Sequence, residues 1–455
     1  MNKKYYIKTF GCQMNTSDSE RIASFLESKG FSLAKEIQEA DLAIFNTCGI
    51  KQTAENRAYS MINNLRKSQS KVKSRKSKAI VMTGCLANRS DVQKRMKLKV
   101  DLFTEIKNFQ ESIFEINLLK KNKDIFSKEN LAYLSIQPKH ESSFQAYVPI
   151  MTGCNNFCSY CVVPHARGRE VSRPANEIIS EVKDLISKNY KHIILLGQNV
   201  NSYKSPQSLS SSPSGRGCRV LTTGEGTNFS QLLKKINSIG GKFWISFVSS
   251  HPKDMSDELI ETVAKCKKVC EWIHLPVQAG DDAILAKMNR KYTKKHYLGR
   301  IKKIKLAFKK YKPDSMLSIS SDIIVGFPGE TNKQFLQSAD VMEKSKFDMV
   351  FFGQFSPRPG TVAWKMKDNV SQEEKFRREN FLNDILKKAT LANNKKYVGK
   401  TLEVLIEKEK DGFYFGKTRT QKNVKIISKK KLPIGEFVKV KIAKANIWNL
   451  EGNIR

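Results

Sequence analysis

Three cysteines in one short loop are the residues of this sequence best suited to carry out chemistry. Cys154, Cys158 and Cys161 are spaced C-x3-C-x2-C within the run 153–169. A zinc site closes with four protein ligands, and iron–sulfur cubanes commonly take four thiolates. Three thiolates can hold three irons of a cubane and leave the fourth iron open to another ligand. Three buried thiols, or a zinc loop without its fourth ligand, are alternatives that fit this polar Gly/Asn-rich loop less well.

A second set of three cysteines follows three predicted strands near the N-terminus. Strands are predicted over 5–9, 42–46 and 79–82, with helical stretches between them, which indicates a parallel sheet. Each strand is followed by one cysteine: Cys12, Cys48 and Cys85. Open α/β folds place ligands at the carboxyl edge of the sheet, so we expect the three thiols to meet there. One strand-end cysteine would be ordinary core, but three in the same relative place predict a second metal cluster.

A second α/β series positions the C-x3-C-x2-C loop. A strand predicted over 146–151 leads into the loop, and a helix predicted over 176–187 follows it. Further strands are predicted over 192–196, 243–248, 272–276, 316–325 and 349–355, with helices such as 257–268, 295–310 and 333–344. Six strand–helix units fit an open parallel barrel whose active face is formed by the carboxyl ends of its strands. Polar residues gather at these ends: Gln198, Asn199, Ser249–His251, Gln278, Asp281, Ser320–Asp322 and Gln354.

The C-terminal part of the sequence predicts a small antiparallel β-barrel. A charged helical connector over 371–396 precedes short strands over 402–406, 412–419, 424–427 and 436–443. Lysines and the aromatic run 413–415 favour binding of nucleic acid, with a purely structural barrel as the alternative. The expected fold class is therefore multidomain α/β. It comprises an open parallel sheet over 1–125, a partial (β/α)6 barrel over 140–372 with an insertion at about 204–228, and the small barrel over 390–455.

Length, charge and cysteine usage limit the classes of protein to consider. A chain of 455 residues is too long for one core. No run reaches the roughly 18 apolar residues of a membrane helix, and the N-terminus lacks a signal peptide's apolar core, so we expect a cytoplasmic protein without membrane contact. The net charge of +37 favours a polyanionic partner, although a lysine-rich coding bias would explain part of it. The nine cysteines then indicate metal ligands or core residues rather than disulfides.

Several further stretches carry structural expectations. The acids of Asp18–Glu20 are expected to open a helix that runs to about Lys29. Lys71–Lys78 is expected to be a solvated loop, with phosphate contact as an alternative, and 120–143 a linker. Pro206–Asn228 indicates a disordered surface insertion in which Cys218 holds no metal. Cys266 and Cys270 could form a metal pair, but ordinary helix cysteines are the favoured interpretation.

The motifs together resemble the radical S-adenosylmethionine (SAM) enzymes, and among them the bacterial tRNA methylthiotransferases that make 2-methylthio-N6-isopentenyladenosine. The resemblance covers nearly the whole chain and rests on the following segments: Gly11–Asn15, Asp18–Glu20, Asn46–Cys48, Gly84–Cys85, Gly153–Arg169, Leu196–Tyr203, His274–Gln278, Met288–Thr293 and Asp322–Thr331. Gly11–Asn15 and Gly197–Tyr203 resemble the isopentenyladenosine branch most closely. The insertion after Tyr203 departs from the family pattern without touching a catalytic motif.

The resemblance implies an N-terminal cluster domain, a radical SAM core and an RNA-binding TRAM domain. It implies SAM and two 4Fe–4S clusters, one on Cys154, Cys158 and Cys161 that binds and cleaves SAM, and one on Cys12, Cys48 and Cys85 that supplies sulfur. The radical from SAM would remove the hydrogen at C2 of adenine, which acid–base groups cannot activate, and a second SAM would methylate the sulfur. The expected SAM contacts are Gln198, Asn199, Gln278, Ser320 and Asp322. Arg167 and Arg169 could pair with a carboxylate or a tRNA phosphate, or remain solvated.

Other functions and partners complete the expectations. Related methylthiotransferases act on threonylcarbamoyladenosine in tRNA or on an aspartate of a ribosomal protein. A non-catalytic iron–sulfur protein that binds RNA is the alternative from another class, although a structural cluster gains nothing from an open iron. The expected partners are the anticodon stem-loop of tRNA and an electron donor such as flavodoxin or ferredoxin, and the expected oligomeric state is a monomer.

Overall fold

The computed structural model describes residues 3–50, 52–70, 78–113, 116, 133–206 and 226–454. The chain divides into two compact units. The first unit contains 1–141 together with two later segments, 152–171 and 356–365. The second contains 142–151, 172–355 and 366–455. The C-x3-C-x2-C loop therefore belongs to the same unit as the N-terminal sheet. Cys218 and most of the insertion lie outside the described residues, as do 71–77 and 117–132.

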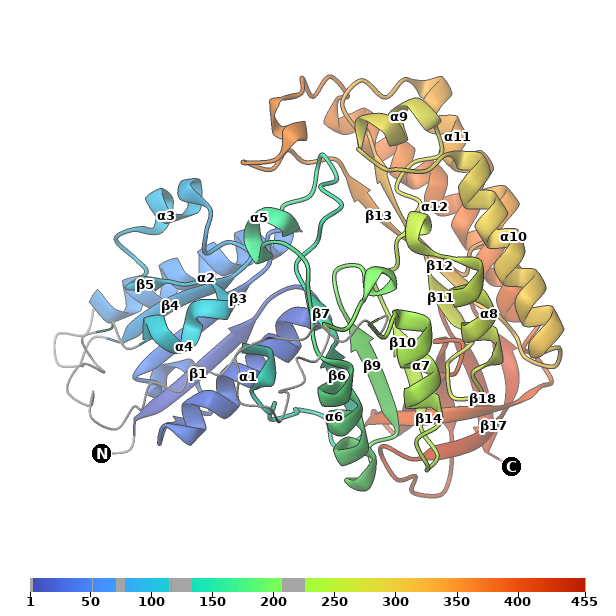
Figure 1. The fold of residues 1–455 in the computed structure, drawn as a ribbon, viewed down its shortest axis with the longest axis horizontal. Helices are drawn as coiled ribbons and strands as arrows, with labels where there is room; N and C mark the ends of the chain where they lie inside the picture. Colours follow the sequence, from blue (N-terminus) through green and yellow to red (C-terminus); the bar gives the residue numbers. More distant parts are fainter. Residues whose placement is uncertain are drawn as a thin grey trace, which may run out of the picture. The chain divides into compact units, whose positions relative to one another are not determined.

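The first unit is built on a five-stranded parallel sheet (Figure 1). Its strands are β1 (Lys4–Thr9), β2 (Ser32–Leu33), β3 (Leu42–Thr47), β4 (Ala79–Gly84) and β5 (Leu102–Phe103), in the order β2-β1-β3-β4-β5. Every residue of β3 and β4 is buried, which explains their nearly continuous apolar sequence. The strand order reverses direction between β1 and β3, so the connections after these strands leave on opposite faces of the sheet.

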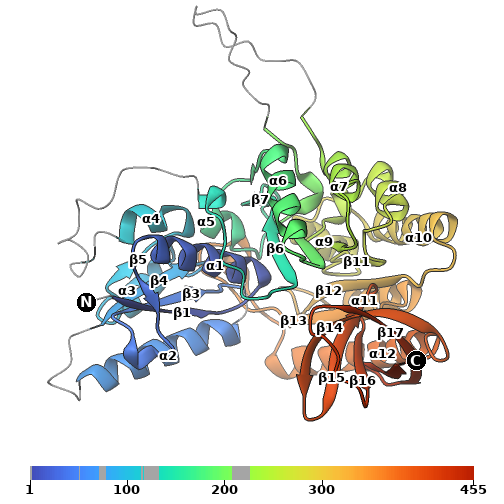
Figure 2. The same cartoon turned by 90° about the horizontal axis from the view of Figure 1, so that it is seen from below.

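Helices cover both faces of this sheet, as Figure 2 shows from below. Helices α1 (Gln13–Ser28) and α4 (Phe109–Ser112) pack on the face that carries Leu42 and Ile44. Helices α2 (Gln52–Ser70) and α3 (Ser90–Met96) pack on the face that carries Ala43 and Phe45. Alternate residues of one strand thus enter two separate cores, as the two-residue period of a strand requires. Short helical turns at Ile37–Glu39, Ile106–Asn108 and Tyr133–Ser135 complete the unit.

The structure contradicts two expectations for this region, the start of the first helix and the solvation of Lys78. Helix α1 begins at Gln13 rather than at Asp18, because Asp18 and Glu20 are buried and paired with side chains from elsewhere in the unit. Lys78 is not solvated, since its ammonium donates to the carbonyls of Ile37, Gln38 and Ala40. The described end of the expected linker, 133–141, packs on helix α1 through its own hydrogen bonds.

The second unit contains six parallel strands in two sheets. Strands β6 (Gln145–Pro149), β9 (His192–Leu196) and β10 (Trp244–Phe247) form one sheet, and β11 (Trp272–His274), β12 (Ser318–Val325) and β13 (Met349–Gln354) form the other. Only an isolated bridge between Ile245 and Val269 continues the ladder from β10 towards β11 in the described chain. Two short strands, β7 (Met151–Thr152) and β8 (Val171–Ser172), flank the cysteine loop.

Seven of the described helices belong to this series of strands or directly follow it. They are α6 (Ala175–Ser187), α7 (Phe229–Asn237), α8 (Asp257–Lys265), α9 (Asp282–Lys287), α10 (Lys294–Tyr311), α11 (Asn332–Ser345) and α12 (Gln372–Lys395). Helical turns occur at Val200–Ser202, Pro252–Asp254 and Val362–Lys365, and helix α5 (Val163–Arg167) ends the cysteine loop. Side-chain caps start α7, α8, α9, α10, α11 and α12, which explains their sharp beginnings. None of the helices within the described ranges combines the length and apolar composition needed to cross a membrane.

The chain ends in a closed five-stranded barrel. Its strands are β14 (Thr401–Lys410), β15 (Phe413–Thr418), β16 (Asn423–Ile427), β17 (Phe437–Ala445) and β18 (Leu450–Ile454), in the order β14-β15-β16-β18-β17. The sequence analysis missed β18, which pairs with β16 and β17 and closes the barrel. The turn between β14 and β15 uses positive φ angles at Asp411 and Gly412, which matches the preference of tight hairpins for Asp-Gly.

The barrel packs on the amino ends of the parallel strands within the second unit. The ring of Trp244, the first residue of β10, lies 4.7 Å from that of Phe437. Glu271 precedes β11 and accepts hydrogen bonds from Arg419 at 2.7 and 2.8 Å and from Lys312 at 2.8 Å. Burial alone would raise the pKa of Glu271, but the two cations hold it below its usual value. This buried ion cluster joins the barrel to the strand end opposite the carboxyl edge.

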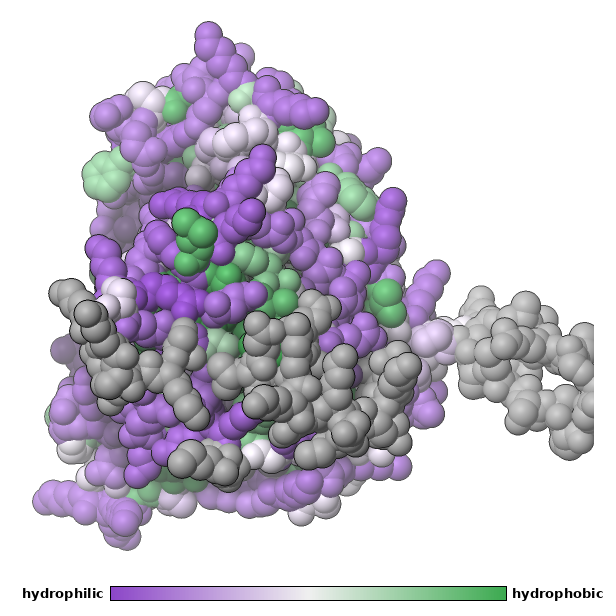
Figure 3. All heavy atoms as spheres, turned by 90° about the vertical axis from the view of Figure 1, so that its left-hand side faces the viewer, coloured by the Kyte–Doolittle hydropathy of each residue, from purple (hydrophilic) through white to green (hydrophobic). Residues whose placement is uncertain are grey.

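The face of the molecule shown in Figure 3 is covered mainly by hydrophilic residues, with small hydrophobic patches between them. Of the two remaining cysteines in the described chain, Cys266 ends helix α8 and Cys270 lies in a core with Trp244 and Leu405. Burial raises the pKa of Cys270 to about 12, as is typical of a structural thiol.

Candidate active site

Two glycines allow the strand-end cysteines of the first unit to approach one another. Gly11 has a φ of 103°, and a Cβ built on it would lie 2.4 Å from the Cβ of Cys48. Gly84 has a φ of 83°, and a Cβ there would lie 2.4 Å from the carbonyl oxygen of Thr47. Any side chain at either position would push the strand ends apart. The glycine before Cys12 and the glycine before Cys85 are therefore required for the thiols to converge.

Buried amides fix the same strand ends. Asn15 is fully buried, and its Nδ2 donates to the carbonyl of Phe10 at 2.7 Å and to that of Thr47 at 2.9 Å. Phe10 directly follows β1 and Thr47 ends β3, so one side chain ties the two strand ends together. Asn46 adds a second link between β3 and helix α1, since its Nδ2 donates to the carbonyl of Asn15 at 2.8 Å. The sequence analysis placed Asn15 in a motif but gave it no role.

The environment of the three thiols is electrostatically mixed. Cys12 is exposed, whereas Cys48 and Cys85 are buried. Desolvation by the surrounding protein raises the pKa of Cys12, and the nearby thiols of Cys85 and Cys48 raise it further. Arg167 opposes this shift by lowering the pKa of Cys12. A Cβ on Gly11, the residue before Cys12, would lie 2.7 Å from the sulfur of Cys48, and a Cβ on Gly49 would lie 3.4 Å from the Cβ of Cys85, so the three cysteines are neighbours along this edge.

The C-x3-C-x2-C loop closes on itself. The backbone N–H of Cys154 donates to the carbonyl of Gly168 at 3.2 Å. A Cβ on Gly153, which has a φ of 77°, would lie only 2.0 Å from the carbonyl oxygen of Arg169. The guanidinium of Arg169 stacks on Phe157, 4.4 Å from the ring centroid. Arg169 therefore supports the loop from outside, an arrangement that the sequence did not indicate.

The thiols of this loop differ in exposure. Cys154 is buried, and Cys158 and Cys161 are half-buried. Burial raises the pKa of Cys154, while hydrogen bonds from Asn156 lower it and the Cys158 thiol raises it again. The side-chain amide of Asn156 lies 3.6 Å from the sulfur of Cys154. Partly accessible sulfurs on a short, closed loop suit a cluster that must meet a second molecule.

Arg167 links the two sets of cysteines within the first unit. Its guanidinium donates to the carboxylate of Asp18 at 2.6 Å and to Oδ1 of Asn15 at 2.8 Å. The arginine side chain is 7% exposed and that of Asp18 is 0% exposed. Burial opposes the charge on Arg167, but Asp18 and then the Cys85 thiolate outweigh it and raise the pKa of the arginine. Of the alternatives left open for Arg167, the structure selects the carboxylate partner.

A second buried arginine reaches the neighbourhood of Cys48 from the segment 356–365. Arg358 donates to the carbonyl of Ile50 at 2.9 Å and lies 3.2 Å from the carboxylate of Glu55. Arg89 also pairs with Glu55, at 2.9 Å. Burial lowers the pKa of Arg358, while Glu55 and the Cys48 thiolate raise it. Sequence reasoning missed Arg358, because the residue lies more than 300 positions from its partners.

Unpaired polar atoms mark the carboxyl ends of β9 and β10 in the second unit. In the described part of the chain, Oε1 of Gln198, both polar side-chain atoms of Asn201 and Oγ of Ser250 are buried without hydrogen-bond partners. Buried polar atoms are normally satisfied, so these atoms indicate a place for a polar ligand. In Asn199 the Nδ2 donates to Asp254 at 2.7 Å, while the buried Oδ1 has no hydrogen-bond partner. Asn201 is a further candidate that the sequence analysis did not single out.

The other expected SAM contacts lie on β12 and the loop beside it. Ser320 is buried and bonded to Trp272 and His274 at 2.9 Å, so its hydroxyl is already occupied. Asp322 is partly exposed, and its carboxylate lies 3.5 Å from Nε2 of His274. Gln278 has a φ of 70° and its N–H donates to the carbonyl of Asp322. Asp322 and Gln278 thus lie side by side at this edge.

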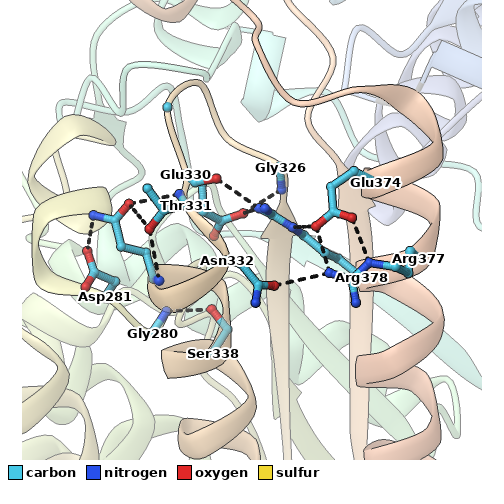
Figure 4. A network of polar contacts seen from close by, with 12 residues as sticks. Gly280, Asp281, Gly326, Glu330, Thr331, Asn332, Ser338, Glu374, Arg377 and Arg378 are labelled. Atoms are coloured by element: carbon cyan, nitrogen blue, oxygen red, sulfur yellow. Dashed lines mark hydrogen bonds and ion pairs between the residues drawn. The ribbon is translucent and has the colours of Figure 1, made fainter.

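A buried glutamate shapes the loop that follows β12 (Figure 4). Glu330 accepts from the N–H of Gly326 at 2.8 Å and from Arg378 at 2.9 Å. Arg378 also donates a hydrogen bond to Glu374. Asp281 accepts a hydrogen bond from the side-chain amide of Gln334 at 3.0 Å. The polar residues of this network form hydrogen bonds with one another. The segment Asp322–Thr331 therefore serves largely to fix the conformation of the loop.

The donor set fits iron–sulfur clusters. In the stretches of chain that the structure describes, no three His, Cys, Asp or Glu side chains are grouped to hold a single metal ion. In a cubane, however, each thiolate binds its own iron, so the sulfurs need not converge on one point. Two sets of three thiols satisfy that chemistry, and the unpaired atoms of Gln198, Asn201 and Ser250 offer hydrogen bonds to a polar nucleoside such as SAM.

Comparison with known families assigns each region. The family described as "Uncharacterized protein family UPF0004" matches residues 4–104, the "Radical SAM superfamily" matches 148–342, and the "TRAM domain" matches 395–454. The fold and the cysteine loop thus define a radical SAM enzyme with an additional N-terminal domain and a TRAM domain. The expected fold class is confirmed.

Curated relatives refine this class. The tRNA-2-methylthio-N(6)-dimethylallyladenosine synthase of Clostridium botulinum strain Hall is 40% identical over 459 residues, covering 99% of this chain and 96% of the relative. The enzymes of the same name from Clostridium novyi and Thermoanaerobacter pseudethanolicus are 39% identical and cover 97% and 93% of their own lengths. The chain belongs to the family of tRNA-2-methylthio-N(6)-dimethylallyladenosine synthases. As a radical SAM enzyme of this family, it uses SAM and 4Fe–4S clusters as cofactors.

Solved structures support the fold. The radical SAM methyltransferase TsrM from Kitasatospora setae, with tryptophan and a SAM analogue bound, aligns with a TM-score of 0.54 at 11% identity, over 80% of this chain and 75% of that chain. The cobalamin-dependent SAM radical enzyme OxsB aligns with a TM-score of 0.51 at 11% identity, over 84% and 56%. At such low identity the likeness concerns the fold alone.

Proposed function

We propose that this chain is a radical SAM methylthiotransferase that adds a methylthio group to C2 of N6-isopentenyladenosine at position 37 of tRNA. The observation that carries the proposal is the presence of two sets of three cysteines in one compact unit. The membership of the chain in the synthase family supports the choice of substrate. When bound, the clusters and SAM supply the radical chemistry and the sulfur that an unactivated aromatic C–H requires.

The residues of the chain have separate tasks in this proposal. Cys154, Cys158 and Cys161 hold the cluster that binds SAM, and the loop around them keeps that cluster in place. Cys12, Cys48 and Cys85 hold the cluster that provides sulfur. Gln198, Asn199, Asn201, Gln278, Ser250 and Asp322 are the proposed contacts to SAM, and Ser320 orients His274 instead of binding SAM directly.

The remaining partners follow from the same chemistry. The basic TRAM domain, with Lys425 3.6 Å from the ring centroid of Phe413, is proposed to grip tRNA near the anticodon stem-loop. A small electron donor such as flavodoxin or ferredoxin is proposed to reduce the SAM-binding cluster. We further infer that the protein acts as a cytoplasmic monomer with domains over 1–125, 140–372 and 390–455.

Two cysteine variants test the proposal. The protein is reconstituted with iron and sulfide without oxygen, and iron per chain, 5′-deoxyadenosine and modified nucleoside are measured with an anticodon stem-loop carrying isopentenyladenosine. Cys158→Ala is expected to abolish 5′-deoxyadenosine formation. Cys48→Ala is expected to retain SAM cleavage but to make no methylthio product. Full product from Cys48→Ala, or binding of zinc in place of iron, would refute the assignment.

A further inference from the structure

Arg167 occupies an unusual place between the two sets of cysteines. It lies six residues after Cys161, at the end of helix α5, yet its guanidinium contacts Asp18 and Asn15 on helix α1. The pair with Asp18 is almost completely removed from solvent. Breaking a buried ion pair is costly, so the loop is held firmly at this point.

The two acceptors of Arg167 each reach further into the site. Asn15 ties the carbonyls at the ends of β1 and β3, which lead to Cys12 and Cys48. Asp18 also accepts a hydrogen bond from the hydroxyl of Tyr133, which further fixes its carboxylate. A shift of Arg167 would therefore be transmitted directly to the strand ends that carry thiols.

The charge of Arg167 acts on the same edge. Oδ1 of Asn15 accepts from Arg167 at 2.8 Å and lies 3.8 Å from the sulfur of Cys12, so the guanidinium and this thiol share one acceptor. An arginine retains its charge at any physiological pH. Net charge around a cluster sets its reduction potential, since a nearby cation stabilises the more negative, reduced state.

We propose that Arg167 is a positioning residue that couples the two cysteine sets: it anchors the SAM-cluster loop to the edge that bears Cys12, Cys48 and Cys85, and it places a positive charge beside that edge. This inference rests on the proposed function. Arg167 touches neither substrate nor reacting atoms in this account. Its effect is to keep SAM cleavage productive and to raise the reduction potential of the sulfur-supplying cluster.

The test distinguishes an electrostatic effect on the reduction potential from a structural one by using substitutions that change the local charge in opposite directions. Arg167→Met removes a positive charge, Arg167→Lys retains it, and Asp18→Asn removes the negative charge while keeping the shape of the acceptor. Glu181→Gln is the matched control, because Glu181 forms an equally buried pair with Arg173 at 2.7 Å in the second unit. Each variant is also made with Cys158→Ala, so that only the Cys12, Cys48 and Cys85 cluster is loaded and its potential can be measured by electron paramagnetic resonance.

We expect the potential to fall in Arg167→Met and to rise in Asp18→Asn, and to stay at the wild-type value in Arg167→Lys and Glu181→Gln. In the enzyme with both clusters, we expect the ratio of 5′-deoxyadenosine to methylthio product to rise at least fivefold in Arg167→Met and by less than twofold in Arg167→Lys. Shifts of the reduction potential in the same direction in Arg167→Met and Asp18→Asn, or no shift in either, would overturn the inference. A purely structural defect does not depend on the sign of the charge that was removed.

The iron content of each variant keeps the result interpretable. If Arg167→Met fails to load iron, the test rests on Asp18→Asn, whose potential is expected to rise, and on Arg167→Lys, whose potential is expected to stay at the wild-type value. An unchanged potential in Asp18→Asn then rejects the inference. If the wild-type protein itself cleaves no SAM and makes no product, the proposed function fails, whereas the potentials still report on Arg167.

Discussion

Gly153 offers a sharp test of how the SAM-cluster loop is built. A Cβ at this position would meet the carbonyl oxygen of Arg169 at 2.0 Å, a separation at which the backbone has to move. The positive φ of 77° costs an L-residue about 1–2 kcal/mol, and forced repacking costs about 1–3 kcal/mol more. We therefore expect Gly153→Ala to lower the free energy of unfolding of the cluster-free protein by roughly 2–5 kcal/mol.

Gly30→Ala is the matched control, since Gly30 also has a positive φ, 80°, but nothing lies within 4 Å of the added Cβ. This variant should cost only the conformational part, about 1–2 kcal/mol. Urea unfolding measures both variants, and iron analysis after anaerobic reconstitution shows whether Gly153→Ala loses the irons of the Cys154, Cys158 and Cys161 set alone. Equal stabilities in the two variants, with full iron in both, would refute the claim that close backbone approach defines this loop.

Three further predictions concern other buried contacts. Gly11→Ala should prevent loading of the first cysteine set, because the new Cβ would lie 2.4 Å from that of Cys48, and iron per chain should fall by about half without loss of SAM cleavage. Arg358→Ala should destabilise the protein by about 1–3 kcal/mol in urea unfolding, since it removes one of the two buried cations that pair with Glu55, and an unchanged free energy of unfolding would contradict this. Glu271→Gln should destabilise the protein at neutral pH by about 3–5 kcal/mol, because it removes the negative charge between two buried cations. The folded pKa of Glu271 is lowered, so the difference in unfolding free energy between variant and wild type should persist above about pH 4.3 and shrink as the pH falls further. A difference that grows in acid would show that the sign is wrong.

The local patterns of the sequence carried most of the fold and the donor atoms of the site. Strand β9 matches its predicted range, 192–196, because a fully buried strand is a continuous apolar run bounded by polar residues. The assignment of the six thiols to two clusters is a proposal made from spacing and from their place after strands, which are properties of the chain alone. β18 was missed because Leu450–Ile454 contains only two apolar residues, and it becomes a strand by closing the barrel.

Only the tertiary structure decided which distant residues meet the cysteines. The sequence predicts that Asp18 lies at the start of a helix, yet its side chain is buried and paired with Arg167, 149 positions away. Arg358 and Glu55 are separated by 303 positions, and no periodicity links them. Spacing along a chain reports contacts within a loop or a helix turn. Charge pairs of this kind form instead when packing buries both partners, because a buried charge needs a partner of opposite sign. The sequence by itself thus determined the chemistry available to this protein, and the folding of separate segments into one unit determined the charges that surround it.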